Sequence, residues 1–300
     1  MRAREELRRL PDVEVRTDEP MSRHTSFRIG GPADILVLPH TSDAVCGALR
    51  IAAVHETPVH ILGDGSNVLV RDRGLRGVVL KIADNLAAAE VQGERIVAQG
   101  GARLGRLAHL AAEASLTGLE FAIGIPGTVG GAAVMNAGAY SGEIGTLIAE
   151  VDTVTRDGEP CRHDRDELCF EYRDSSLRRA GEIVVGVVLE LRAGEREQIE
   201  ARMAEMQQQR RDKQPVSLPS AGSIFRRPEG DYAGRLIEAA GLKGACIGGA
   251  EVSEKHAGFI VNRGGATAAD VIRLIDHVRE TVAERTGVRL ELEVRIMGDD

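Results

Sequence analysis

Residues 118–145 read GLEFAIGIPGTVGGAAVMNAGAYSGEIG, a stretch in which glycines alternate with small apolar residues and charge is nearly absent. Glycine tolerates positive φ and lets a ligand approach main-chain amides closely. Residues 125–131, IPGTVGG, therefore predict an amide cradle for phosphate oxygens. Taken alone, the pattern is equally typical of a buried, glycine-rich turn between strands. The surrounding sequence has to decide between these two interpretations.

A second glycine turn lies upstream, at residues 63–70, GDGSNVLV. It leads directly into an apolar run that predicts a strand, whereas the GxGxxG turn of a Rossmann fold opens a helix. This turn is therefore not a Rossmann fingerprint. A second phosphate-facing turn is the functional interpretation, and an ordinary hairpin is the alternative.

Hydrophobic periodicity outlines the rest of the chain. Residues 33–63 alternate strand, helix and strand, which predicts a βαβ unit, and residues 77–191 are mostly strand-like. A polar helix over residues 195–213 ends in QPVSLPSAG, which is typical of a domain junction. A helix over residues 267–286 precedes a closing strand, VRLELEVRIM, at residues 288–297.

Composition limits the classes of function. The 300 residues are 43% hydrophobic and 28% charged, as in globular proteins of two or three domains. A net charge of −8 and only 3% aromatic residues argue against a nucleic-acid partner. No run approaches the ~20 apolar residues of a membrane span, so we expect a cytoplasmic protein without a membrane partner. The four cysteines lack metal-ligand spacing, so we expect no metal site.

Three residues of chemical interest stand in distinctive local settings. Arg173 follows Tyr172, and its rigid, charged fork suits a carboxylate or phosphate. Ser223 lies beside apolar residues in SAGSIFRRP, where a buried hydroxyl serves as a proton relay or hydrogen-bond donor. Strict strand alternation places Glu293 opposite the apolar face of the closing strand. The alternatives are a surface arginine, a turn-capping serine and a solvent-exposed glutamate.

Several blocks in the same order carry a family resemblance. Besides the opening stretch, they are SFRIGGPADILVLP from Ser26, ILGDGSNVLVRD from Ile61, YRDSS from Tyr172, QPVSLPSAGSIFRRP from Gln214, LIEAAGLKGACIGGAEVSEKHAGFIVNRGGATAADV from Leu236 and LELEVRIMG from Leu290. Together they resemble the UDP-N-acetylenolpyruvoylglucosamine reductase (MurB) family. Only about fifty residues separate Arg173 from Ser223, so the chain resembles the family's shorter, type II form.

The resemblance implies an α+β protein with the three-domain FAD-binding fold of the vanillyl-alcohol oxidase/PCMH-like type and a C-terminal α+β substrate-binding domain. The implied domains are an FAD-binding subdomain at residues 1–80, completed by a C-terminal strand at 288–300, a second FAD-binding subdomain at 81–200, and a substrate-binding domain at 210–287.

The resemblance also implies an activity. The family is NADPH-dependent and reduces UDP-N-acetylglucosamine enolpyruvate to UDP-N-acetylmuramate in peptidoglycan precursor synthesis, with non-covalent FAD as cofactor. We expect a monomer whose partners are NADPH and this substrate. The alternatives are a related flavin oxidase acting on a sugar or alcohol, and a non-redox protein that binds nucleotide sugars.

Site residues follow from the same resemblance. Arg173 and Glu293 would stabilise charge on the substrate carboxylate, with Glu293 protonated or sharing a hydrogen bond, and Ser223 would donate the proton. The implied cofactor-binding residues are Gly63, Asp64, Gly65, Ser66, Asn67, Gly127, Thr128, Val129, Gly130, Gly131, Asn136, Gly138 and Ala139. The implied substrate contacts are Tyr172, Lys213, Lys243, His256 and Arg295.

Two positions depart from the family pattern. Asp64 stands where glycine is common, and Arg227 stands where asparagine is usual. If the amides bind the pyrophosphate, the Asp64 carboxylate must point away from it. Arg227 replaces the asparagine at one expected substrate contact.

Overall fold

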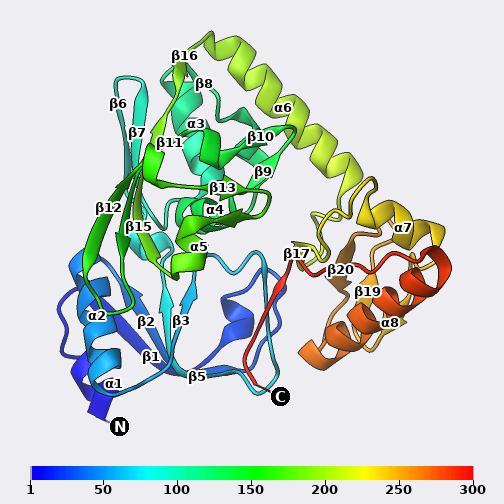
Figure 1. Cartoon of the computed structure of the whole chain (residues 1–300), viewed down its shortest axis with the longest axis horizontal. Coiled ribbons are helices and arrows are strands. Elements are labelled where there is room, and N and C mark those ends of the chain that lie inside the picture. The colour runs from blue at the N-terminus through cyan, green and yellow to red at the C-terminus, as the bar shows by residue number, and fades with distance from the viewer. Residues whose placement is uncertain (1, 300) are drawn as a thin grey trace. The chain divides into compact units, whose positions relative to one another are not determined.

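The computed structural model describes residues 2–299, which form a mixture of helices and sheets (Figure 1). The chain divides into two compact units. Unit 1 takes the chain up to Thr17, then Ile35–Asp64 and Gly77–Gln209. Unit 2 takes Asp18–Asp34, Gly65–Arg76 and the chain from Arg210 onward. Among the described residues, every helix is too short or too polar to cross a lipid bilayer.

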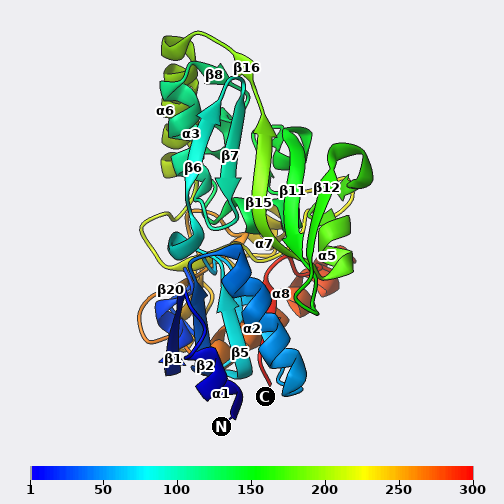
Figure 2. The same cartoon turned by 90° about the vertical axis from the view of Figure 1, so that its left-hand side faces the viewer.

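An antiparallel sheet with strand order β12-β11-β15-β7-β6 dominates unit 1 (Figure 2). Its strands are β6 (Ala89–Gln92), β7 (Arg95–Gln99), β11 (Ile148–Val154), β12 (Pro160–Asp164) and β15 (Ile183–Glu190). The central strand β15 reads IVVGVVLE and is buried at nearly every position. A β-branched run of this kind is typical of a strand that is covered on both faces.

Helices cover this sheet with their apolar faces. Helix α3 (Leu104–Glu113) buries Leu104, Leu107, Ala108, Ala111 and Ala112, a spacing that keeps one helical stripe in the core. They pack in a core that also includes α4 (Val129–Met135) and residues of β11 and β15. The remaining helices that begin in this unit are α1 (Arg2–Leu7), α2 (Ser42–Val54), α5 (Ser176–Ala180) and α6 (Arg196–Lys213).

A second sheet has the strand order β1-β2-β5-β3. Its strands are β1 (Val13–Pro20), β2 (Pro32–Pro39), β3 (Val59–Leu62) and β5 (Leu75–Lys81), with β3 parallel to β5. Helix α2 begins after Thr41, whose side chain accepts a hydrogen bond from the Ala44 amide at 3.1 Å. This capping satisfies an amide that has no partner inside the helix.

The C-terminal part of unit 2 is a sheet with helices α7 (Ala233–Ala239) and α8 (Ala268–Thr286). The strand order is β17-β20-β19-β18, from β17 (Ser220–Ser223), β18 (Cys246–Ile247), β19 (Ala250–Val252) and β20 (Phe259–Asn262). Helix α8 begins at a capping box between Thr267 and Asp270 and ends at Gly287, which has φ of 73°. Both ends follow the residue chemistry expected for helix termini.

Short elements complete the chain. Three two-residue strand pairs link β8 (Leu116–Thr117) to β16 (Arg192–Ala193), β9 (Gly138–Ala139) to β10 (Gly142–Glu143), and β13 (Phe170–Glu171) to β14 (Asp174–Ser175). The 3-10 helices are η1 (Met21–Arg23), η2 (Asp84–Leu86), η3 (Glu120–Gly124), η4 (Ile144–Thr146) and η5 (Arg165–Glu167).

The predicted closing strand is wrong in its extent. Of residues 288–297, only Arg295–Met297 form a strand, β21, which pairs in parallel with β4 (Val68–Val70). The preceding residues pair with another segment, since Leu292 forms an isolated bridge with Phe225. The chain changes partner between the two pairings, so no continuous ladder forms over the predicted range.

Candidate functional site

The two glycine turns meet inside unit 1. Gly63 directly follows β3, and Thr128 is the N-cap of α4. A Cβ atom built on Gly63 would lie 2.7 Å from Thr128 Oγ1, closer than real Cβ contacts. A side chain at position 63 would therefore force Thr128 or the turn to shift.

Four backbone amides at this junction donate no hydrogen bond within residues 2–299; they belong to Gly63, Asp64, Gly127 and Thr128. Gly127 has φ of 120°, a conformation open to glycine. Unpaired backbone donors are rare in folded proteins, and neighbouring ones form a concavity that suits an anion. The junction therefore fits the oxygen atoms of a phosphate or pyrophosphate.

The other amides of the second turn serve the fold. Val129 donates to the Ala102 carbonyl at 2.7 Å, and Gly130 donates to the Gly100 carbonyl at 2.8 Å. The Gly131 amide donates to Thr128 Oγ1 at 3.3 Å. Three amides of the predicted cradle at residues 125–131 therefore already have acceptors inside the protein.

Asn136 has a structural role at the end of α4. Its φ of 41° ends the helix, and its side chain is buried. The side-chain amide donates to Glu143 Oε2 and to the Glu171 carbonyl, each at 3.0 Å, and its oxygen accepts from the Gly145 amide at 3.0 Å. Both amide protons are engaged within the protein, which argues against the predicted cofactor contact through this side chain.

Arg173 lies near Gly138 in the same unit. It has φ of 57°, its Nη2 donates to the Gly138 carbonyl at 3.4 Å, and its guanidinium lies 5.1 Å from the ring centre of Tyr172. Arg173 is half-buried, while Tyr172 is exposed. The contacts bring Arg173 together with Tyr172 and with Gly138 of β9.

A group of charges that sequence reasoning missed surrounds Asp64. Arg103 Nη2 lies 3.6 Å from Asp64 Oδ1, and the same guanidinium binds Asp84 with two hydrogen bonds of 3.0 and 2.9 Å. Burial lowers the pKa of Lys81, and the carboxylates of Asp64 and Asp84 oppose this shift. No local motif marks Arg103 or Lys81; the fold brings them to the turn.

Unit 2 brings Ser223 and Glu293 together. Ser223 ends β17, and the next residue, Ile224, accepts a hydrogen bond from the Glu293 amide at 2.8 Å. The Glu293 carbonyl accepts from Asn67 Nδ2 at 3.1 Å, and the Asn67 carbonyl accepts from the Arg295 amide at 3.0 Å. Ser223 and Glu293 are both half-buried, so Glu293 is less exposed than strand alternation predicts.

The first glycine turn continues into unit 2. Gly65 has φ of 66°, and a Cβ atom there would lie 2.3 Å from the His24 carbonyl oxygen. Ser66 and Asn67 follow before β4 begins. The structure therefore requires glycine at position 65 for two reasons, backbone conformation and close packing.

Among the predicted substrate contacts of unit 2, Lys243 and His256 each have a partner of their own. Lys243 Nζ pairs with Glu238 at 2.6 Å. Burial lowers the pKa of His256, and its Nδ1 accepts from the Gly258 amide at 3.1 Å. The neutral ring with this tautomer presents its other nitrogen as a donor. Lys213 is exposed at the end of α6.

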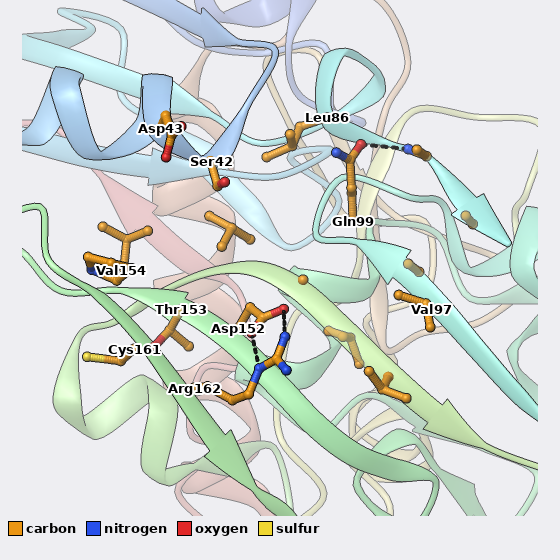
Figure 3. Close-up of a pocket in the computed structure, with 18 of the residues that line it drawn as sticks. Ser42, Asp43, Leu86, Val97, Gln99, Asp152, Thr153, Val154, Cys161 and Arg162 are labelled. Atoms are coloured by element: carbon orange, nitrogen blue, oxygen red, sulfur yellow. Dashed lines mark hydrogen bonds and ion pairs between the residues drawn. The ribbon is translucent and has the colours of Figure 1, made fainter. Parts of the chain in front are cut away.

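A cavity of about 500 Å³ lies elsewhere in unit 1, against the five-stranded sheet (Figure 3). Arg162 of β12 binds Asp152 of β11 there with hydrogen bonds of 2.6 and 3.0 Å. None of the predicted site residues lines this cavity. Arg162 and Asp152 pair with each other there, and the cavity is distinct from the junction of the glycine turns.

Comparisons with known proteins match two parts of this chain to family models. The family model of the FAD binding domain matches residues 33–163, and that of the UDP-N-acetylenolpyruvoylglucosamine reductase C-terminal domain matches residues 214–297. The UDP-N-acetylenolpyruvoylglucosamine reductase of Geobacillus thermodenitrificans is 49% identical over 95% of this chain and 94% of its own length. That of Clostridium botulinum strain Hall is 47% identical over 95% of this chain and 93% of its own. The chain belongs to the UDP-N-acetylenolpyruvoylglucosamine reductase family.

A solved structure extends the relationship to three dimensions. The crystal structure of UDP-N-acetylenolpyruvylglucosamine reductase (MurB) from Thermus caldophilus has a TM-score of 0.82 and 36% identity, covering 95% of this chain and 99% of that one. This confirms the MurB recognition and the α+β FAD-binding fold class with its C-terminal reductase domain. The FAD-binding match includes both glycine turns, and the C-terminal match includes Ser223 and Glu293.

Proposed function

We propose that this chain is an FAD-dependent oxidoreductase that uses NADPH to reduce UDP-N-acetylglucosamine enolpyruvate to UDP-N-acetylmuramate, a peptidoglycan precursor. The observation that carries the proposal is the 47% identity to a reductase of this name over 95% of the chain. We further assign the enzyme to the cytoplasm as a monomer. Its FAD-binding region takes in residues 1–80, 81–200 and the C-terminal strand, and its substrate-binding region residues 210–287.

The unpaired amides support the cofactor assignment. Gly63, Asp64, Gly127 and Thr128 supply backbone donors for the FAD pyrophosphate, in a chain with no excess of positive charge. Gly65, Ser66 and Asn67 extend the first turn, and Gly138 and Ala139 of β9 extend the second. When bound, FAD takes hydride from NADPH and supplies it to the substrate. The protein contributes binding and orientation.

Arg173 stabilises the charge that the substrate develops. Hydride adds to C3, the terminal carbon of the enol ether, and negative charge builds at C2 and in the adjacent carboxylate. A guanidinium binds a carboxylate through two parallel hydrogen bonds. Glu293 shares a further hydrogen bond with the substrate carboxylate. The cation–π contact with Tyr172 and the bond to the Gly138 carbonyl restrict the orientation of Arg173.

Ser223 completes the reaction by giving its hydroxyl proton to C2. Hydride at C3 and a proton at C2 replace the double bond, so the product carries two more hydrogens than the substrate. Ile224 accepts from the Glu293 amide, which fixes the main chain next to the serine. Lys213, Lys243, His256, Arg295 and Tyr172 bind the UDP and sugar groups.

The proposal is tested by following both cofactor and product. The purified protein should contain one flavin per chain, released on denaturation as FAD. With NADPH and UDP-N-acetylglucosamine enolpyruvate under nitrogen, mass spectrometry should detect a product two hydrogens heavier than the substrate. NADPH oxidation that needs oxygen and leaves the substrate unchanged would instead identify a flavin oxidase, and absence of flavin would remove the redox function.

A further inference from the structure

Asp64 creates an electrostatic problem for the proposed cofactor site. Its amide is one of the unpaired donors of the glycine turn, yet the same residue carries a carboxylate. Two negative groups in a partly dry site repel, and the repulsion is larger than in bulk water. The side chain of Asp64 is 27% exposed, so water screens it only in part. A pyrophosphate held by this turn therefore needs a nearby compensating charge.

We propose that Arg103 is a positioning residue of the FAD site, which neutralises the Asp64 carboxylate and so permits pyrophosphate to bind at the turn. The inference rests on the proposed FAD binding and goes beyond it. Arg103 Nη2 lies 3.6 Å from Asp64 Oδ1. This ion pair draws the carboxylate toward the guanidinium and lowers the negative potential at the turn.

The backbone of Arg103 is tied to the second glycine turn. Arg103 and Thr128 form an isolated antiparallel bridge, in which the Leu104 amide donates to the Gly127 carbonyl at 3.1 Å. Arg103 thus contacts both halves of the cradle, Asp64 through its side chain and Thr128 through its main chain.

Asp84 fixes the orientation of that guanidinium. It accepts hydrogen bonds of 3.0 and 2.9 Å from Nε and Nη2 of Arg103, a bidentate geometry that an ammonium lacks. Lys81 interacts electrostatically with both carboxylates. Lys81, Arg103, Asp64 and Asp84 carry balanced charge, and loss of Arg103 leaves one uncompensated negative charge beside the phosphate site.

A double-mutant cycle in FAD affinity tests the inference. FAD is titrated into the full-length apoprotein of the wild type, Arg103→Gln, Asp64→Asn and the double variant, and flavin fluorescence gives each dissociation constant. Arg103 is 54% exposed, so we expect Arg103→Gln to weaken binding about tenfold at low salt, and less at high salt. The double variant should return to within about threefold of the wild type, because the uncompensated carboxylate is gone.

Arg106→Gln is the matched control, because Arg106 lies in α3, of which Arg103 is the N-cap, and donates to the Ala87 carbonyl at 2.9 Å. It should leave FAD affinity within about twofold of the wild type. The variant removes one positive charge but leaves the ion pair between Arg103 and Asp64 intact. Melting temperatures of the apoproteins separate lost affinity from lost folding. If Arg103→Gln does not fold, Asp64→Asn alone decides, and it should bind FAD more tightly than the wild type.

A double variant as weak as Arg103→Gln would overturn the inference, because Arg103 would then act on FAD without Asp64. Unchanged affinity in Arg103→Gln, or weaker binding in Asp64→Asn, would overturn it as well. Failure of the wild type to bind FAD would contradict the proposed function instead. The two failures are therefore distinguishable.

Discussion

At the scale of single residues, Ser223 is where the proposed chemistry is most specific. A serine hydroxyl is a weak acid in water, but it serves as a proton donor to a carbon centre with developing negative charge. In the structure its neighbour Ile224 is bonded to the Glu293 amide, so the serine and the glutamate share one short segment of unit 2. We propose no part for Ser223 in holding the cofactor, so its loss should separate the two halves of the reaction.

We predict that Ser223→Ala slows reoxidation of the reduced flavin by substrate about 10²–10⁴-fold. Reduction of the flavin by NADPH should remain within about twofold of the wild-type rate. Stopped-flow absorbance under nitrogen measures each half-reaction separately. Equal losses in both would mean that Ser223 supports the flavin site and not proton delivery.

Arg173→Lys should be poorly tolerated although it keeps the charge. An ammonium cannot reproduce the planar fork, and it would not keep the guanidinium's contact with the Tyr172 ring. We expect the rate of substrate reduction to fall roughly ten- to hundredfold, the value of one charge-assisted hydrogen bond. Steady-state kinetics with saturating NADPH provide the measurement, and turnover close to that of the wild type would exclude Arg173 from charge stabilisation.

His256 provides a prediction about pH. Burial lowers its pKa below the ordinary value of 6.5, with nearby Lys243 as a smaller cause in the same direction. A histidine of this kind contributes stability above its unfolded pKa, and that contribution is lost as pH falls through the folded pKa. When the pH is lowered from 7.5 to 5.5, the melting temperature of His256→Asn should therefore fall less than that of the wild type. Identical losses in thermal unfolding scans would show that His256 titrates normally.

At the scale of elements, the contact between the end of β3 and the start of α4 defines the candidate cofactor site. The separation of 2.7 Å between a Gly63 Cβ and Thr128 Oγ1 leaves no room for a side chain. Gly63→Ala should push the two turns apart at a cost of about 1–3 kcal/mol, with a weaker affinity for FAD. Flavin fluorescence titration measures the loss.

Thr128→Ala provides the control for that prediction, because it removes the oxygen that a Gly63 side chain would strike. In the Thr128→Ala background, Gly63→Ala should therefore cost less FAD affinity than it does in the wild type. A penalty of the same size in both backgrounds would mean that the alanine acts elsewhere, for instance on the ligand directly.

The sequence predicts that these turns exist, but it does not predict which of their groups bond within the fold and which remain available to a ligand. The glycine pattern marks both turns because tight backbone approach needs glycine locally. It cannot show which amides remain unpaired, since Val129 and Gly130 bond to distant carbonyls of Ala102 and Gly100. Asn136 illustrates the same limit, because its partners Glu143 and Glu171 come from separate strands.

The closing strand shows a related limit. Its apolar alternation persists in the burial of Leu290 and Val294, yet the ladder is confined to Arg295–Met297. Alternation reports which face is buried, whereas strand extent depends on which segment lies alongside. Arg103 was not predictable either, since only the folded chain brings it to Asp64.

At the scale of the whole molecule, the family relationship covers 95% of the chain and thus both compact units. Unit 1 contains the paired turns and Arg173, and unit 2 contains Ser223 and Glu293. The proposed reduction of the substrate needs a proton donor, whereas flavin binding and flavin reduction by NADPH do not. Reoxidation by the enolpyruvyl substrate is therefore the step that tests the proposed function most fully.

The most direct measurement is an anaerobic titration of the full-length holoenzyme. One equivalent of NADPH should bleach the flavin absorbance, and one equivalent of UDP-N-acetylglucosamine enolpyruvate should restore it with formation of an equal amount of UDP-N-acetylmuramate. A flavin that stays reduced until oxygen is admitted, with the substrate recovered unchanged, would contradict the proposed function.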